Sequence, residues 1–215
     1  PFASADDLCK DKEGNIYILD SGNSRVVKIN ADMELLEVID LSELELVEPQ
    51  GICFDKEGKL YVADKGAKAV FVCTPQGKLI RKILKPVSDI IDEKTDFAPV
   101  KCLVDSNMIL YVLSFGSFEG AYTFDESGDF LGFFGSNKVN VTQQLLSDRF
   151  WRLFATSAQR ERMYRYVPIE YKNFCIDESN FIYTVSNFGE QEAEGQVKKL
   201  NPLSKNILFL GRKPD

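Results

Sequence analysis

An internal repeat constrains the fold of this chain more than any other feature of its sequence. The segment CKDKEGNIYILD, at residues 9–20, returns as CFDKEGKLYVAD at residues 53–64, an offset of 44 residues. Two weaker copies follow at residues 103–114 and 175–186, and all four keep an aspartate with a tyrosine six residues later. A unit repeated every 40–50 residues or so predicts similar substructures that pack side by side.

Each copy predicts four short strands. A small apolar strand ends at the aspartate, and a polar turn with Gly or Asn, residues that tolerate positive φ, leads to a strand rich in β-branched residues around the tyrosine. A third and an outer fourth strand follow, which in the last copy are Gln196–Leu200 and Ile207–Leu210. Four antiparallel strands in about 40–50 residues are typical of a β-propeller blade. We therefore expect an all-β, single-domain propeller over residues 1–215, with about four blades.

Composition excludes several classes of function. The chain has 215 residues and a net charge of −7, which argues against nucleic acid as a partner because affinity for phosphate backbones depends largely on Lys and Arg. No apolar run approaches about 18 residues, so no membrane-inserted segment is expected. The chain contains no histidine, which removes the usual general base and the commonest zinc ligand.

The five cysteines do not suggest a metal site. They are scattered and form no CxxC pair, and a disulfide framework is not expected in a chain of this length. Three of them, Cys9, Cys53 and Cys175, stand two residues before the repeated aspartate, on the strand expected to be innermost. We interpret all five as small hydrophobic residues that pack in the core.

Two segments resemble a known repeat family. The sequence DSGNSRVVKI at residues 20–29 and PQGICFD at residues 49–55 resemble the NHL repeat. That resemblance implies a six-bladed propeller, of which this chain would be a part. Only the first copy has both Asn23 and Arg25 of the motif, which become Ala67 and Ala69 in the second. We interpret Asp20 and Arg25 as a brace between strands rather than as ligand-binding residues.

Residues 140–166, between copies three and four, do not follow the strand pattern. Leu146, Phe150, Leu153 and Phe154 fall on one face of a helix, so we expect a helical insertion within the propeller.

The insertion is basic, with five arginines against two acidic residues over 141–165, and holds the only tryptophan. It has two interpretations: a cap on the propeller, or a docking surface in which Trp151, Arg149 and Arg152 bind a partner. The segment resembles NHL-like proteins of Gram-positive gut bacteria, which implies export to the cell envelope or the extracellular space.

Three functions remain open. We favour a non-enzymatic module that binds a protein, peptide or glycan through loops that carry Phe115, Phe118 and Phe188. The first alternative is a propeller lyase or hydrolase that uses a carboxylate-bound metal; no cofactor is expected, although calcium is chemically possible. The second, an RNA-binding NHL module, needs a basic face that this acidic chain does not predict.

Overall fold

The structure is a computed structural model that describes residues 1–92, 94–117, 119–135, 170–186 and 197–208. Within these ranges the chain forms β-strands and two short 3₁₀ turns, η1 (Ser21–Asn23) and η2 (Ser42–Leu44), and no α-helix. In the same ranges, no helix has the length and apolar character needed to span a membrane. The predicted all-β class is confirmed, whereas the predicted helical insertion at 140–166 lies outside the described residues.

Each copy of the repeat forms one antiparallel sheet, or blade, whose strands are hydrogen-bonded in chain order. Blade 1 contains β1 (Ala5–Lys10), β2 (Ile16–Asp20), β3 (Arg25–Ile29) and β4 (Leu35–Asp40). Blade 2 contains β5 (Pro49–Phe54), β6 (Leu60–Asp64), β7 (Ala69–Cys73) and β8 (Leu79–Ile83). Blade 3 contains β9 (Pro99–Val104), β10 (Leu110–Ser114), β11 (Ala121–Phe124) and β12 (Phe130–Phe134). Blade 4 contains β13 (Tyr171–Ile176), β14 (Ile182–Ser186) and β15 (Val197–Leu200).

Blade 4 departs from the prediction at its outer edge. Three strands, rather than four, are present in the part of this blade that the structure describes. Beyond β15, only Asn206 pairs with Leu200, through an isolated bridge. The rest of the strand predicted at Ile207–Leu210 runs into residues 209–215, which are outside the described ranges.

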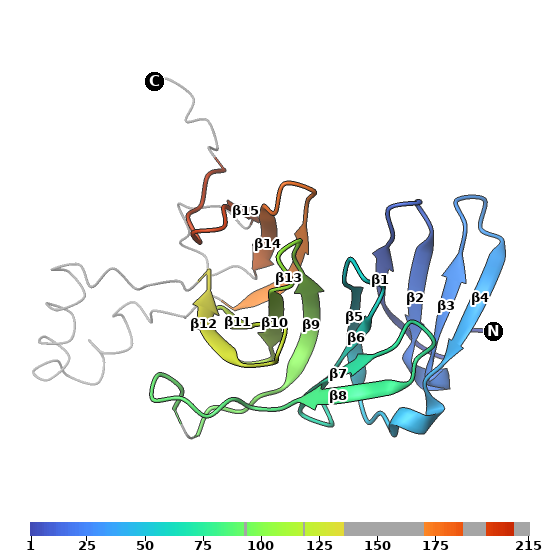
Figure 1. Cartoon of the computed structure of the whole chain (residues 1–215), viewed down its shortest axis with the longest axis horizontal. Coiled ribbons are helices and arrows are strands. Elements are labelled where there is room, and N and C mark those ends of the chain that lie inside the picture. The colour runs from blue at the N-terminus through green and yellow to red at the C-terminus, as the bar shows by residue number, and fades with distance from the viewer. Residues whose placement is uncertain (93, 118, 136–169, 187–196, 209–215) are drawn as a thin grey trace, which may run out of the picture.

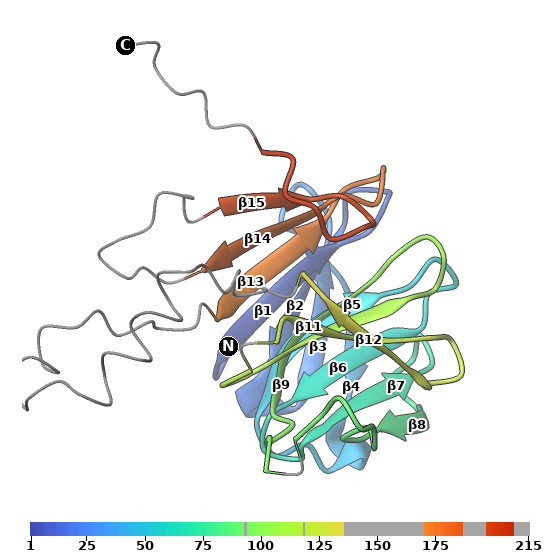
Figure 2. The ribbon, with the colours of Figure 1, turned by 90° about the vertical axis from the view of Figure 1, so that its left-hand side faces the viewer.

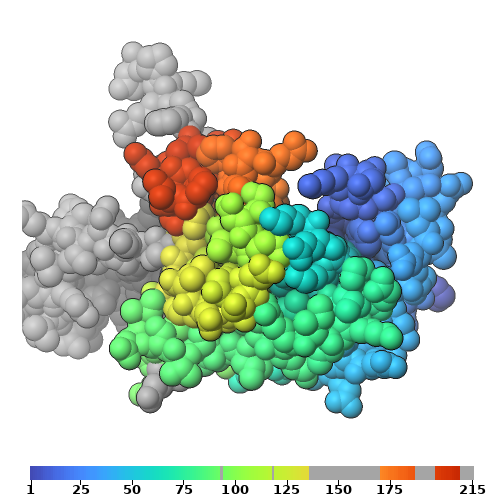
Figure 3. Space-filling model, viewed as in Figure 1, coloured from blue at the N-terminus to red at the C-terminus, as the bar shows by residue number. Residues whose placement is uncertain are grey.

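The blades are arranged as a propeller, with the first strand of each one innermost. Strand β5 packs against both β1 and β9, and β9 packs against β13. Two views at right angles show the blades following one another in chain order, from blue to red (Figures 1 and 2). In the space-filling view, the orange and red surface of blade 4 lies above the yellow and green surface of blades 3 and 2, and the blue surface of blade 1 lies to its right (Figure 3).

The core consists of apolar layers between successive blades. Leu19 and Val26 of blade 1 pack with Ile52 and Phe71 of blade 2, and equivalent layers join blade 2 to blade 3 and blade 3 to blade 4. Each middle blade therefore buries both of its faces, and every residue of β6, β7 and β10 is buried.

The repeated aspartate and tyrosine build the turn between the first two strands of each blade, which we call the turn end. The Asp55 carboxylate accepts hydrogen bonds from the backbone N–H groups of Glu57, at 2.8 Å, and Lys59, at 2.9 Å, and from the Tyr61 hydroxyl, at 3.2 Å. In the other three turns the aspartate also accepts bonds from the tyrosine hydroxyl and from the backbone N–H four residues on. The interpretation of these aspartates as local turn residues is confirmed.

A second aspartate braces the opposite end of blades 1 and 2. Asp20 is fully buried and accepts hydrogen bonds from the backbone N–H groups of Ala3 and Ser4, from the Asn23 amide and from the Arg25 guanidinium, 2.8 Å away. These bonds hold the pKa of the Asp20 carboxyl well below its usual range, against the opposing effect of burial. The predicted brace between Asp20 and Arg25 is confirmed.

Candidate functional site

The end of the blades opposite the turn end carries a polar pocket on the propeller axis. Its volume is about 310 Å³, and every blade contributes to it. The side chains that line it come from the start of each innermost strand, four and five residues before the turn aspartate: Asp6, Asp7, Gln50, Val100, Lys101, Lys172 and Asn173. We call this the axial pocket. Because the four innermost strands run alongside one another, equivalent positions of the repeat meet here.

An ion pair crosses the floor of the axial pocket. The Lys101 ammonium, from blade 3, contacts the Asp7 carboxylate of blade 1, and both side chains are largely buried. Asp7 also accepts a hydrogen bond from the Ile52 N–H at 2.8 Å. Gly51 is the equivalent residue of blade 2, and a Cβ atom there would lie 2.7 Å from the Val100 carbonyl oxygen. Glycine therefore allows β9 to approach β5, which lets Lys101 reach across blade 2.

An aromatic ring and two further ion pairs form the rim of the pocket: Glu48, Lys65, Phe115, Glu170 and Lys172. The Phe115 side chain follows β10 and is 55 % exposed. Lys65 and Lys172 place their Nζ atoms 5.2 and 5.6 Å from the centre of the ring. Lys65 pairs with Glu48 at 2.7 Å, and Lys172 pairs with Glu170 at 2.5 Å. The axial pocket and this rim together are called the mouth.

Thiols lie below the mouth, nearer the turn end. The Cys53 and Cys102 Sγ atoms are 3.5 Å apart, and both side chains are buried. Burial, with a smaller contribution from Asp7, raises the pKa of the Cys9 thiol to about 12. The Cys9 thiol therefore stays protonated and unreactive at neutral pH, as the packing interpretation predicts.

The prediction was wrong for Cys175, which is exposed. It occupies the position of Cys53, but the face of blade 4 on which it lies has no following blade among the described residues.

The sequence-predicted site residues divide into two groups. Phe115 lies on the rim, where it contacts Lys65 of blade 2 and Lys172 of blade 4. The other five are outside the described residues and stay predictions: Phe118, Phe188, Arg149, Trp151 and Arg152.

The sequence interpretation missed the residues of the axial pocket, although a signal was present. Four residues before the repeated aspartate, the four copies read Asp7, Gly51, Lys101 and Asn173. The turn is preserved in all four copies, whereas the residue at this position changes in charge and size from blade to blade.

No metal centre is evident in the part of the chain that the structure describes. No three His, Cys, Asp or Glu side chains gather there closely enough to bind an ion. The repeated aspartates stay in separate turns, so they do not form the calcium site considered from the sequence.

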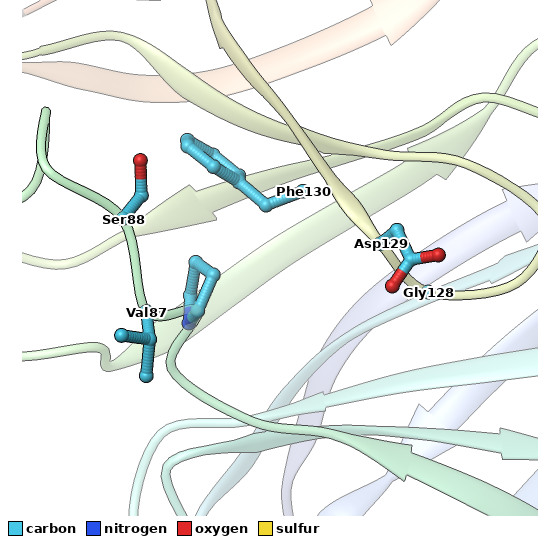
Figure 4. Close-up of a pocket in the computed structure, with 6 residues that line it drawn as sticks. Val87, Ser88, Gly128, Asp129 and Phe130 are labelled. Atoms are coloured by element: carbon cyan, nitrogen blue, oxygen red, sulfur yellow. The ribbon is translucent and has the colours of Figure 1, made fainter.

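A second pocket, of about 380 Å³, lies between the segment after β8 and the start of β12 (Figure 4). Its lining includes one ionisable side chain, Asp129, whose carboxylate points away from Val87 and Ser88 (Figure 4). This pocket offers no convergent polar groups, so the mouth is the stronger candidate.

Comparison with sequence families identifies one of the blades. Residues 46–73, which span β5 to β7, match the model of the NHL repeat. The first three strands of the second blade are therefore similar to an NHL repeat. The structure places the other three copies of the repeat in equivalent blades. No curated protein matches the chain in sequence.

Solved structures share the fold at low sequence identity. A catalytically inactive histidine-to-alanine variant of virginiamycin B lyase from Staphylococcus aureus, with quinupristin, has a TM-score of 0.56 and 12 % identity, over 96 % of this chain and 55 % of its own. A streptogramin B lyase has a TM-score of 0.53 and 10 % identity, over 91 % and 50 %. A protein of unknown function from Bacteroides caccae has a TM-score of 0.57 and 13 % identity, over 93 % and 64 %. The chain thus spans about half to two thirds of these structures, and the likeness shows the fold alone.

Proposed function

We propose that this chain is a non-catalytic binding module and that its ligand lies across the mouth. One observation carries the proposal: the four blades share a turn end but place different polar side chains around the axis at the opposite end. A scaffold needs no such variation. Polar groups that converge in a concave site, beside an exposed aromatic ring, can fix the orientation of a bound ligand.

The charges of the mouth favour a polar protein, peptide or glycan partner over nucleic acid. Four carboxylates, on Asp6, Asp7, Glu48 and Glu170, face three ammonium groups, on Lys65, Lys101 and Lys172. This balance lacks the excess of cations that a phosphate backbone requires. We place the module at the cell envelope or outside the cell, and fractionation of the source cells tests that location.

We also infer that the four blades belong to a larger ring, six-bladed as the NHL resemblance implies, because the described residues leave apolar side chains uncovered on both end faces of the arc. In blade 1, Leu8 is 63 % exposed, whereas its equivalents Ile52 and Cys102 are each 1 % exposed beneath the preceding blade. In blade 4, Val185 and Val197 are exposed at positions that are buried in blades 2 and 3. Further blades would cover both faces. A Leu8→Cys thiol should react with iodoacetamide in this chain and be protected in a longer product of the same gene.

The alternative is a lyase or hydrolase that uses a metal held by carboxylates. It is supported by the shared fold of the two lyase structures. However, one of these lyases is inactivated by loss of a histidine, and this chain contains no histidine. Turnover of a lactone or glycoside that needs an added divalent cation, and that is abolished by Asp7→Asn, would favour the enzyme.

Thermal-shift screening tests the binding proposal. The parent chain and a Gln50→Ala/Phe115→Ala variant are screened against oligosaccharides and peptides. A ligand of the mouth should raise the Tm of the parent chain and not that of the variant, because it stabilises only the form that binds it. Equal shifts in both proteins would exclude the mouth as the binding site.

A further inference from the structure

The rim and floor of the mouth present charges that are already paired. Lys65 is bound to Glu48, Lys172 to Glu170 and Lys101 to Asp7. The remaining pocket carboxylate, Asp6, accepts hydrogen bonds from the Ser4 and Ser21 hydroxyls. An ionic ligand would meet charges that are already neutralised by a partner, which reduces the energy gained from a new ionic contact.

Charged side chains that are paired can still form hydrogen bonds with a ligand, and the arrangement of donors and acceptors in such a pair favours a hydroxyl group. An ammonium only donates and a carboxylate only accepts, whereas a hydroxyl does both. A hydroxyl group can therefore accept from Lys172 and donate to Glu170 without separating them. Gln50 and Asn173 add amide groups that also donate and accept. The mouth thus suits a ligand that is neutral and rich in hydroxyl groups.

The rim also supplies an apolar platform. The exposed Phe115 ring has a negative face, which attracts the weakly positive C–H groups of a sugar ring as it does cations. Lys65 and Lys172, from two different blades, place their ammonium groups over this ring, so hydrogen-bond donors lie close to any sugar that contacts it. The adjoining axial pocket, about 310 Å³, is within the range of about 300–1,000 Å³ of small-molecule sites.

We propose that the mouth binds a neutral oligosaccharide, with one sugar ring against Phe115 and its hydroxyl groups between the paired lysines and glutamates of the rim. This inference rests on the proposed function and names the chemical class of its ligand. An acidic glycan and a peptide are the competing ligands, and each gives a different result below.

Isothermal titration calorimetry on the whole chain tests the proposal. The neutral probes are maltohexaose, cellohexaose, mannohexaose and chitohexaose; the competing probes are hexagalacturonate and a hexapeptide of alternating Glu and Tyr. We expect at least one neutral probe to bind, with a Kd unchanged between 50 and 500 mM NaCl because no net charge is neutralised. Phe115→Ala should weaken that binding about tenfold.

Matched controls separate the mouth from the rest of the surface. Lys65→Met should weaken binding several-fold, whereas Lys59→Met should not change it; Lys59 lies at the turn end and has nearly the same exposure and the same kind of glutamate partner. Leu131→Ala controls for Phe115→Ala, because Leu131 is a similarly exposed apolar residue on the outer strand β12. Circular dichroism and Tm confirm that each variant is folded.

The possible failures differ in meaning. If hexagalacturonate or the peptide binds in a Phe115-dependent manner and no neutral probe does, the assignment to a neutral oligosaccharide is wrong and the proposed function stands. If no probe of any class shows binding that depends on Phe115, both the assignment and the proposed function are overturned.

Discussion

The two ends of this propeller are built from the same repeat but differ in what varies between copies. At the turn end, four aspartates and four tyrosines make the same hydrogen bonds in every blade. At the mouth, equivalent positions hold an aspartate, a glycine, a lysine and an asparagine. The contrast suggests a division of roles, in which the turn end stabilises each blade and the mouth determines what the propeller binds.

The largest expected loss of stability comes from a residue of the mouth, and is therefore an exception to this division of roles. Lys101→Met would leave Asp7 as a buried carboxylate without its cation, so we expect the free energy of unfolding to fall by about 3 kcal/mol in urea titrations. The double variant Asp7→Asn/Lys101→Met should lose less than the single variant. A double variant that loses as much as the single one would show that charge pairing is not the cause.

The next effect measures the contribution of the turn end. Asp55→Ala removes the acceptor for two backbone N–H groups and one hydroxyl, so unfolding should become easier by about 2 kcal/mol. Urea titration of this variant checks the value. A change below about 0.5 kcal/mol, as is usual for surface substitutions, would contradict a structural role for the repeated aspartate.

The turn end also predicts a dependence on acid. The Phe181 N–H, followed by the Ser179 N–H and the Tyr183 hydroxyl, lowers the pKa of the Asp177 carboxyl. Because the pKa in the folded state is below that in the unfolded state, this stabilisation is complete above about pH 4 and is lost as the pH falls through the folded value. Urea midpoints measured from about pH 5 to about pH 3 should fall less steeply for Asp177→Asn than for the parent. Equal slopes would refute the assignment.

The smallest change in the free energy of unfolding is expected for a substitution on the rim. Lys65→Met removes an exposed ion pair, so the free energy of unfolding should change by less than about 0.5 kcal/mol. Lys59→Met, which removes a pair of similar exposure at the turn end, should behave alike in the same titration. A larger loss for Lys65→Met would mean that the rim contributes to folding as well as to binding.

The sequence predicted the blades because their cause is local. The aspartate, the following turn and the tyrosine lie within seven consecutive residues, so a repeat of these letters implies a repeat of the structure. The role of Asp20 could be predicted for the same reason, since Asn23 and Arg25 are close to it in the chain.

The axial pocket could not be found in that way. Asp7 and Lys101 are 94 residues apart in sequence and meet only because the blades turn about one axis. The burial of Cys175 could not be predicted for the same reason. It has the same residue type and repeat position as Cys53, but its burial depends on a neighbouring blade. Strand positions follow from local patterns, whereas contacts between blades depend on the number of blades and on their order.

Unfolding of a combined mouth variant tests the division of roles most directly. Gln50→Ala/Lys65→Met/Phe115→Ala changes three rim and pocket side chains at once, and its urea unfolding is compared with that of the single variant Asp55→Ala. The account predicts that the triple variant stays within about 1 kcal/mol of the parent chain while the single turn-end variant loses about 2 kcal/mol. A triple variant that loses more than Asp55→Ala would contradict it.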